Sequence, residues 1–176
     1  MGTRKTLVIP ALADYAPEIA PAMWRLDDAR KRTYAALEGM DDLLEVQAAE
    51  GAHTPGTLLY HIAAIELDWL IADVLEGKSP DDSIWDLFTD DVRDAQGRLM
   101  LISGHDMAWY RERLDRVRDM LRDTYRNMTL ADFRRARSLE HYDVTPEWVL
   151  HHLAQHEAEH RGELMTLRGL LLRADT

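Results

Sequence analysis

Four segments of the chain carry apolar residues at the alternating three- and four-residue spacing of an amphipathic α-helix. They cover residues 18–40, 54–76, 106–127, and 145 to near the C-terminus. No segment alternates apolar and polar positions over the length of a β-strand. The pattern therefore predicts an all-α fold built from four helices.

The predicted helix boundaries carry recognisable start and stop signals. Thr54 and Thr145 each precede a proline, which places an N-capping hydroxyl before a first helical residue that needs no backbone N–H donor. Gly77 ends the second helix. Residues 78–104 lack the helical spacing, so we expect a long crossover between the second and third helices that holds a short helix or an extended piece.

Length and composition limit the classes of protein that this chain can belong to. A chain of 176 residues fits a single domain, residues 1–176, around one core. With 21 Lys plus Arg against 32 Asp plus Glu, the formal charge of −11 would repel a nucleic acid. The apolar runs are too short to span a bilayer, so we expect a cytoplasmic protein with no membrane partner.

The histidines are the strongest chemical signal in the sequence. Of eight histidines, four lie in the last predicted helix, at positions 151, 152, 156 and 160. His156 and His160 lie four residues apart, so both imidazoles can reach one metal ion, whereas His152 is two turns from His160 and cannot join both. The third ligand must come from another helix, and His61 on the inward face of the second helix is the best candidate.

Residues 156–160 also match the zinc-protease pattern H-E-x-x-H, in which the glutamate activates a metal-bound water. The metzincin extension does not follow His160, and no sheet is predicted to hold a substrate, so we interpret the match as coincidental. Glu157 nevertheless remains the nearest candidate for a catalytic general base. The neighbouring candidates that could hydrogen-bond the ligands or orient a substrate are His152, Arg161 and Glu163, and Gly162 predicts the close approach of another helix.

The last helix, with its string H-x-x-x-H-R-G-E/Q at residues 156–163, resembles the DinB-like superfamily, which includes YfiT-like metal-dependent hydrolases. The resemblance extends to helix order and spacing over nearly the whole chain. It implies a four-helix bundle in which one histidine of the second helix and two of the fourth, here His61, His156 and His160, hold a divalent metal. It also implies a homodimer, which exposed apolar residues such as Trp85 and Phe88 would suit.

Members of this superfamily include thiol S-transferases that use bacillithiol or mycothiol, and a mycothiol-dependent maleylpyruvate isomerase. Three neutral imidazoles would leave an open position on the ion, where the pKa of a bound water or thiol falls. Because the chain has no cysteine, a transferase needs an external low-molecular-weight thiol and a small electrophilic substrate. The alternatives are a hydrolase that uses metal-bound hydroxide with Glu157 as base, and a non-catalytic, metal-stabilised bundle that binds a ligand under stress.

The residue types allow several metals. Zinc or nickel is expected first, and iron and manganese also accept histidine ligands with an open position.

Overall fold

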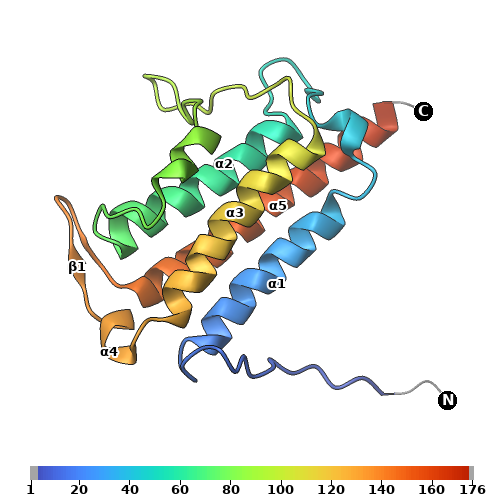
Figure 1. Cartoon of the computed structure of the whole chain (residues 1–176). Helices are drawn as coiled ribbons and strands as arrows, with labels where there is room; N and C mark the ends of the chain where they lie inside the picture. The colour runs from blue at the N-terminus through green and yellow to red at the C-terminus, as the bar shows by residue number, and fades with distance from the viewer. Residues whose placement is uncertain (1–3, 175–176) are drawn as a thin grey trace.

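A computed structural model describes residues 4–174 and shows four long helices packed side by side (Figure 1). These helices are α1 (Ala20–Ala36), α2 (Pro55–Asp68), α3 (Met107–Arg126) and α5 (Pro146–Ala174). Each lies within a segment that the apolar spacing predicts to be helical, and the all-α fold is confirmed. None of the helices in residues 4–174 combines the length and apolar character that a membrane span requires.

Shorter elements occupy the connections between the long helices. They are a π-helix (Trp69–Val74), 3-10 helices (Asp41–Leu43 and Asp82–Leu87), the single-turn helix α4 (Leu130–Phe133), and strands β1 (Arg137–Ser138) and β2 (Asp143–Val144). The two strands pair antiparallel, with Arg137 opposite Val144, in the connection from α4 to α5. Strands of two residues are too short to show an alternating pattern, which explains why the sequence does not predict this hairpin.

The predicted helix starts are confirmed by their capping contacts. The Thr54 side chain accepts a hydrogen bond from the backbone N–H of Thr57, and the backbone N–H of Trp148 donates to the Thr145 hydroxyl over 3.2 Å. The third helix starts in the same manner, with the Asp106 carboxylate as the cap of α3.

The predicted end of the first helix is wrong, and the helical segment of the second ends at Val74, close to its predicted end. The first helix ends at Ala36 rather than at residue 40, before Gly39 turns the chain with a φ of 75°. In the second, regular α-helix ends at Asp68, and the π-helix then widens the turn to i→i+5, as in the 3.0 Å bond from the Leu75 N–H to the Leu70 carbonyl. Apolar spacing predicts a buried face and does not distinguish an α-turn from a π-turn.

The crossover between α2 and α3 has the mixed character that the sequence predicts. It contains the 3-10 helix Asp82–Leu87 and an isolated antiparallel bridge between Arg93 and Leu99. The Tyr60 hydroxyl donates to the Asp90 carbonyl over 2.8 Å and ties the crossover to α2. The crossover is therefore held against the bundle over its central part.

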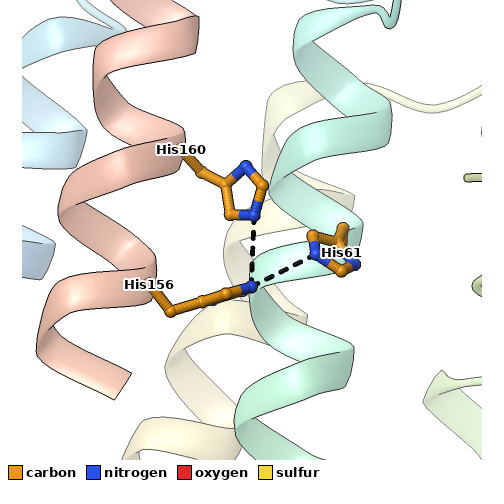
Figure 2. Close-up of side chains that lie close together, drawn as sticks. All are labelled: His61, His156 and His160. Atoms are coloured by element: carbon orange, nitrogen blue, oxygen red, sulfur yellow. Dashed lines mark hydrogen bonds between the residues drawn. The ribbon is translucent and has the colours of Figure 1, made fainter. Parts of the chain in front are cut away.

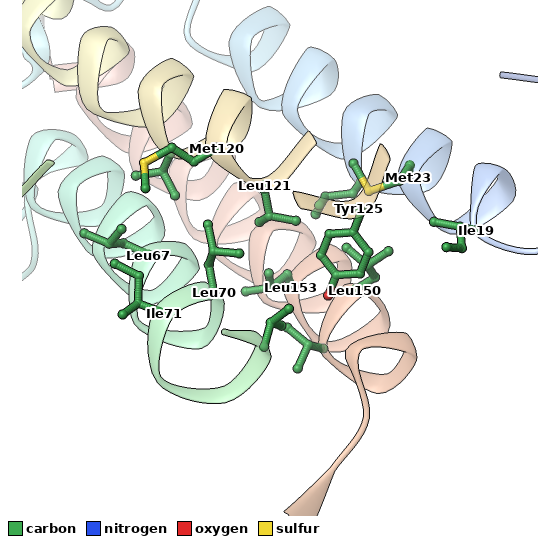
Figure 3. Packing of buried hydrophobic residues seen from close by; sticks show 14 of the residues in the cluster. Ile19, Met23, Leu67, Leu70, Ile71, Met120, Leu121, Tyr125, Leu150 and Leu153 are labelled. Carbon is green, nitrogen blue, oxygen red and sulfur yellow. The ribbon is translucent and has the colours of Figure 1, made fainter. Parts of the chain in front are cut away.

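The buried apolar side chains form two clusters along the bundle. The first, shown in Figure 3, contains Ile19, Met23, Leu67, Leu70, Leu121, Tyr125, Leu150 and Leu153 among others. The second contains Leu58, Leu59, Ile62, Met107, Tyr110, Leu114 and Leu164 among others. On α2 and α5 a buried glutamate separates the residues of one cluster from those of the other, so a charged layer lies between the two clusters.

This charged layer contains Arg30 of α1, Glu66 of α2, Arg118 of α3 and Glu157 of α5, each at most 4% exposed. Arg30 donates to Glu157 over 2.9 Å and to Glu66 over 2.8 Å. Arg118 donates to Glu66 over 2.7 and 2.9 Å and to Glu157 over 2.8 Å. Burial would raise the pKa of Glu66, but Arg118 and Arg30 outweigh it and lower that pKa. Two positive and two negative groups thus tie all four helices together.

Candidate metal centre

Three histidines of two helices converge on one point, as Figure 2 shows. His61 projects from α2, and His156 and His160 project from successive turns of α5. The Nε2 atom of His156 lies 3.2 Å from Nε2 of His61 and 3.1 Å from Nε2 of His160. One ligand atom from each residue lies within 4.8 Å of the others. The structure therefore brings together the three histidines that the sequence predicts as metal ligands.

The burial of His61 would be costly without a ligand. The residue is 3% exposed, and its Nδ1 atom has no hydrogen-bond partner among the described residues. An unsatisfied buried polar atom costs about 1 to 3 kcal/mol. Coordination through the opposite nitrogen, Nε2, would stabilise the buried ring but leave Nδ1 without a partner, so the case for a metal ligand rests on the position of Nε2 in the cluster.

Burial also keeps the imidazoles in the form that binds a metal. Loss of solvent, together with the nearby His156 and His160, lowers the pKa of His61 to about 3. Burial, together with His160, lowers the pKa of His156 to about 4. Both rings are consequently neutral at physiological pH, and each keeps a nitrogen lone pair for coordination.

The spacing of the donor atoms suits a single divalent ion. Zinc–nitrogen bonds of about 2.0 to 2.1 Å in tetrahedral geometry place two ligand nitrogens about 3.4 Å apart. The nitrogen pairs that involve His156, at 3.1 and 3.2 Å, are close to this value. Among residues 4–174, the cluster that contains these atoms includes no fourth His, Asp or Glu, so it has the three-ligand composition typical of open, catalytic sites.

Glu157 is not directed to the histidines, although it neighbours His156 in sequence. Its two carboxylate oxygens accept hydrogen bonds from Arg30 and Arg118 within the charged layer. Glu157 is 1% exposed and both of its oxygens are occupied, so the carboxylate is not free to accept a proton from a water at the histidine cluster. This placement does not fit the general-base role that we expect for Glu157 from the sequence, and assigns the residue to helix packing.

Glu163 lies where it can orient a ligand of the metal. Its Oε2 atom is 3.3 Å from Nδ1 of His160, so it can accept that N–H and direct Nε2 toward the cluster. Arg161 points elsewhere and donates to the Ala29 carbonyl of α1 over 3.3 Å. The expectation for Gly162 is wrong, because a Cβ atom there would meet nothing within 4 Å.

His152 lies outside the ligand cluster, among aromatic rings. Its ring stacks on Trp148 with centroids 5.0 Å apart and an interplanar angle of 10°, and lies 4.6 Å from the Trp69 ring. The distance between the ring centroids of His152 and His156 is 6.0 Å. His152 therefore connects the metal ligands to an aromatic cluster that the sequence does not predict.

The charged layer is the other part of the site that sequence reasoning missed. The sequence does contain an indication of this layer, because Glu66 interrupts an apolar helix and Arg118 directly follows the buried Val117. A charge on an apolar face indicates a buried partner. It does not indicate which helix supplies that partner.

A four-helix bundle that presents three histidines around a common point defines a class of helical proteins whose ligand set is compatible with metal binding. A family model described as the DinB superfamily matches residues 25–164, which include all three histidines. The chain therefore belongs to the DinB superfamily. No curated protein matched the chain in a sequence search.

The low pKa values of the buried histidines predict that the metal-free protein loses stability in mild acid. Below pH 6.5, His61 binds fewer protons in the folded than in the unfolded chain. The free energy of unfolding is therefore highest above pH 6.5 and decreases as the pH drops toward about 3. The expected loss from this residue is at most about 1.4 kcal/mol per pH unit. Denaturant unfolding of chelator-treated protein between about pH 7 and pH 5 measures it, in a range where most carboxylates remain ionised.

His141 supplies the matched control for this experiment, since its side chain is 80% exposed. The His141→Gln variant should retain the pH dependence of the unmodified chain. A free energy of unfolding that stays constant over the same range would contradict the prediction.

Proposed function

We propose that this protein is a metal-dependent S-transferase that activates a low-molecular-weight thiol for attack on a small electrophile. The observation that carries the proposal is the convergence of three imidazoles, His61, His156 and His160, with no other ligand-type side chain in the described group. A divalent ion held there would lower the pKa of a thiol in its open position. The chain has no cysteine, so the thiol is a separate molecule.

The placement of Glu157 favours thiol transfer over hydrolysis. Hydrolysis of a poor substrate benefits from a general base that accepts a proton from water, and the nearest candidate on α5 is held by Arg30 and Arg118. A thiol has an ordinary pKa of about 8.5 and needs less assistance to ionise than water. In the proposed reaction the thiol proton passes to solvent, a sulfur–carbon bond forms, and the leaving group departs with the bonding electrons.

The surface next to His160 has room for a small substrate. A hollow of about 460 Å³ lies beside it, and its lining residues are His53, Leu58, Glu159, Gly162, Glu163, Thr166 and Leu167. Volumes of about 300 to 1,000 Å³ are typical of small-molecule sites. Gly162 leaves this hollow open because it has no side chain, and Glu163 connects it to the ring of His160.

A thiol-transfer assay tests the proposal. Protein loaded with zinc or nickel is incubated with a panel of low-molecular-weight thiols and chlorodinitrobenzene, and the thioether product is measured. We expect product above the uncatalysed rate, and at least about a hundredfold loss of this excess when a chelator removes the metal or in His160→Ala. The His152→Ala variant, which changes a histidine outside the ligand cluster, should retain bound metal.

Two results would contradict the proposal. Protein that binds its ion stoichiometrically and still gives only the uncatalysed rate with every thiol would favour a non-catalytic bundle. Alternatively, hydrolysis of an activated ester without any thiol, at a rate above the thiol reaction, would favour a hydrolase.

A further inference from the structure

An aromatic hollow lies near the start of α5, about two helical turns before His156. Its volume is about 510 Å³, within the range of small-molecule sites. The lining residues are Trp69, Tyr142, Asp143, Val144, Thr145 and Trp148. Three elements meet here: the π-helix that begins at Trp69, the β1–β2 hairpin that carries Tyr142, and the first turn of α5 with Trp148.

The three aromatic rings are arranged around this hollow. The Trp69 ring centroid lies 5.4 Å from that of Trp148 and 6.1 Å from that of Tyr142. The side chains of Trp148 and Tyr142 remain about half exposed, at 47% and 46%. Large aromatic surfaces left open to solvent around a hollow are typical of ligand sites.

The charges around the hollow are negative. Asp143 belongs to its lining, and the Tyr142 hydroxyl donates to the buried carboxylate of Asp73 over 2.8 Å. That bond fixes the tyrosine ring and places a second carboxylate behind it. No lysine or arginine is among the described lining residues, and the guanidinium of Arg137 on the paired strand is occupied by Asp132 and by the Val74 carbonyl.

Aromatic faces combined with carboxylates attract organic cations, because a cation near a ring face interacts with the negative side of the π-system. An anion would meet repulsion from the carboxylates, and an uncharged apolar group would gain nothing from them. We propose that this hollow binds the alkylated ammonium group, such as a trimethylammonium, of a free small molecule.

The hollow is also placed to select a substrate. A continuous series of ring contacts runs from Trp148 through His152 to the ligand His156. Trp148 and His156 are eight residues apart on α5, which corresponds to about 12 Å along the helix axis. A substrate with its cationic end in the hollow could thus reach toward the metal centre. This role in substrate selection rests on the proposed function, whereas the binding of a cation in the hollow does not.

Calorimetric titration of the full chain with choline, and with its uncharged carbon analogue dimethylbutanol, tests the proposal. We expect saturable choline binding that is at least about tenfold tighter than binding of the uncharged analogue, because only the cation gains a cation–π contact with the rings. The measurement is made on both metal-free and metal-loaded protein. Binding by the metal-free protein would support the hollow even if the transferase assay gives no product, so the two proposals fail separately.

Trp85 offers a matched control for Trp148, since both are 47% exposed and Trp85 lies in the crossover. We expect Trp148→Ala to weaken choline binding at least about tenfold and Trp85→Ala to leave it unchanged. Asp143→Asn should weaken choline binding while affinity for dimethylbutanol stays the same. This third variant keeps the test informative if Trp148→Ala does not fold.

Three outcomes would overturn the proposal. These are equal affinity for choline and dimethylbutanol, an equal loss in Trp85→Ala and Trp148→Ala, and binding of a trimethyllysine peptide without any binding of choline. The last outcome would assign the surface to a protein partner instead of a small molecule.

Discussion

His156→Ala should lower the affinity of the protein for a divalent metal by more than about 100-fold, because loss of even a hydrogen-bond partner of a ligand costs 10- to 100-fold. The Nε2 atom of His156 lies within 3.2 Å of the corresponding atoms of both other histidines, so it is the central donor of the group. Elemental analysis of the purified protein and competition with a chromophoric chelator measure the loss.

His152→Ala is the matched control, since His152 lies one turn away on the same helix and outside the ligand group. It should retain about one metal ion per chain with an affinity within a few-fold of the unmodified protein. Full metal content in His156→Ala would contradict the three-histidine site. So would an equal loss in both variants.

Glu157→Ala should lower the free energy of unfolding by about 3 to 5 kcal/mol, the cost of removing one partner from a buried ion pair. The substitution leaves Arg30 and Arg118 with one carboxylate, Glu66, between them at positions that are at most 4% exposed. A stability loss of this size is a large fraction of the total for a domain of this length. Denaturant unfolding, followed by circular dichroism, measures it.

Glu159 provides the control, because it is exposed on the same turn of α5. Glu159→Ala should change the free energy of unfolding by less than about 0.5 kcal/mol. A loss below about 1 kcal/mol in Glu157→Ala would contradict the structural role of Glu157. Such a result, combined with lost activity and retained metal, would return Glu157 to the role of general base.

Much of the fold could be predicted from the periodicity of the apolar residues. The Thr-Pro pairs at residues 54 and 145 mark two helix starts correctly, because capping is a local interaction between neighbouring residues. The end of the first helix was predicted less well, since it comes at Ala36, before the left-handed turn at Gly39. The π-helix after Asp68 depends on how the chain is packed by its neighbours, and apolar spacing carries no record of it.

The candidate metal site also combines features that the sequence predicts with features that depend on packing. The i, i+4 spacing of His156 and His160 places both rings on one edge of a helix regardless of the rest of the chain. His61 required the additional inference that its face of α2 points inward, and its burial confirms that orientation. The contacts of Glu157, in contrast, reversed the role expected from its position between two ligands, because Arg30 and Arg118 come from helices far away in sequence.

The sequence by itself determined four amphipathic helices, two histidines one turn apart, and the need for an external thiol in any thiol chemistry, since periodicity and composition are local properties of the chain. Only the tertiary structure decided that His61 completes the ligand group, that the charged layer holds Glu157, and that Trp69, Tyr142 and Trp148 surround one hollow. Those juxtapositions join residues from different helices and the hairpin, and packing alone sets which side chains of distant segments meet.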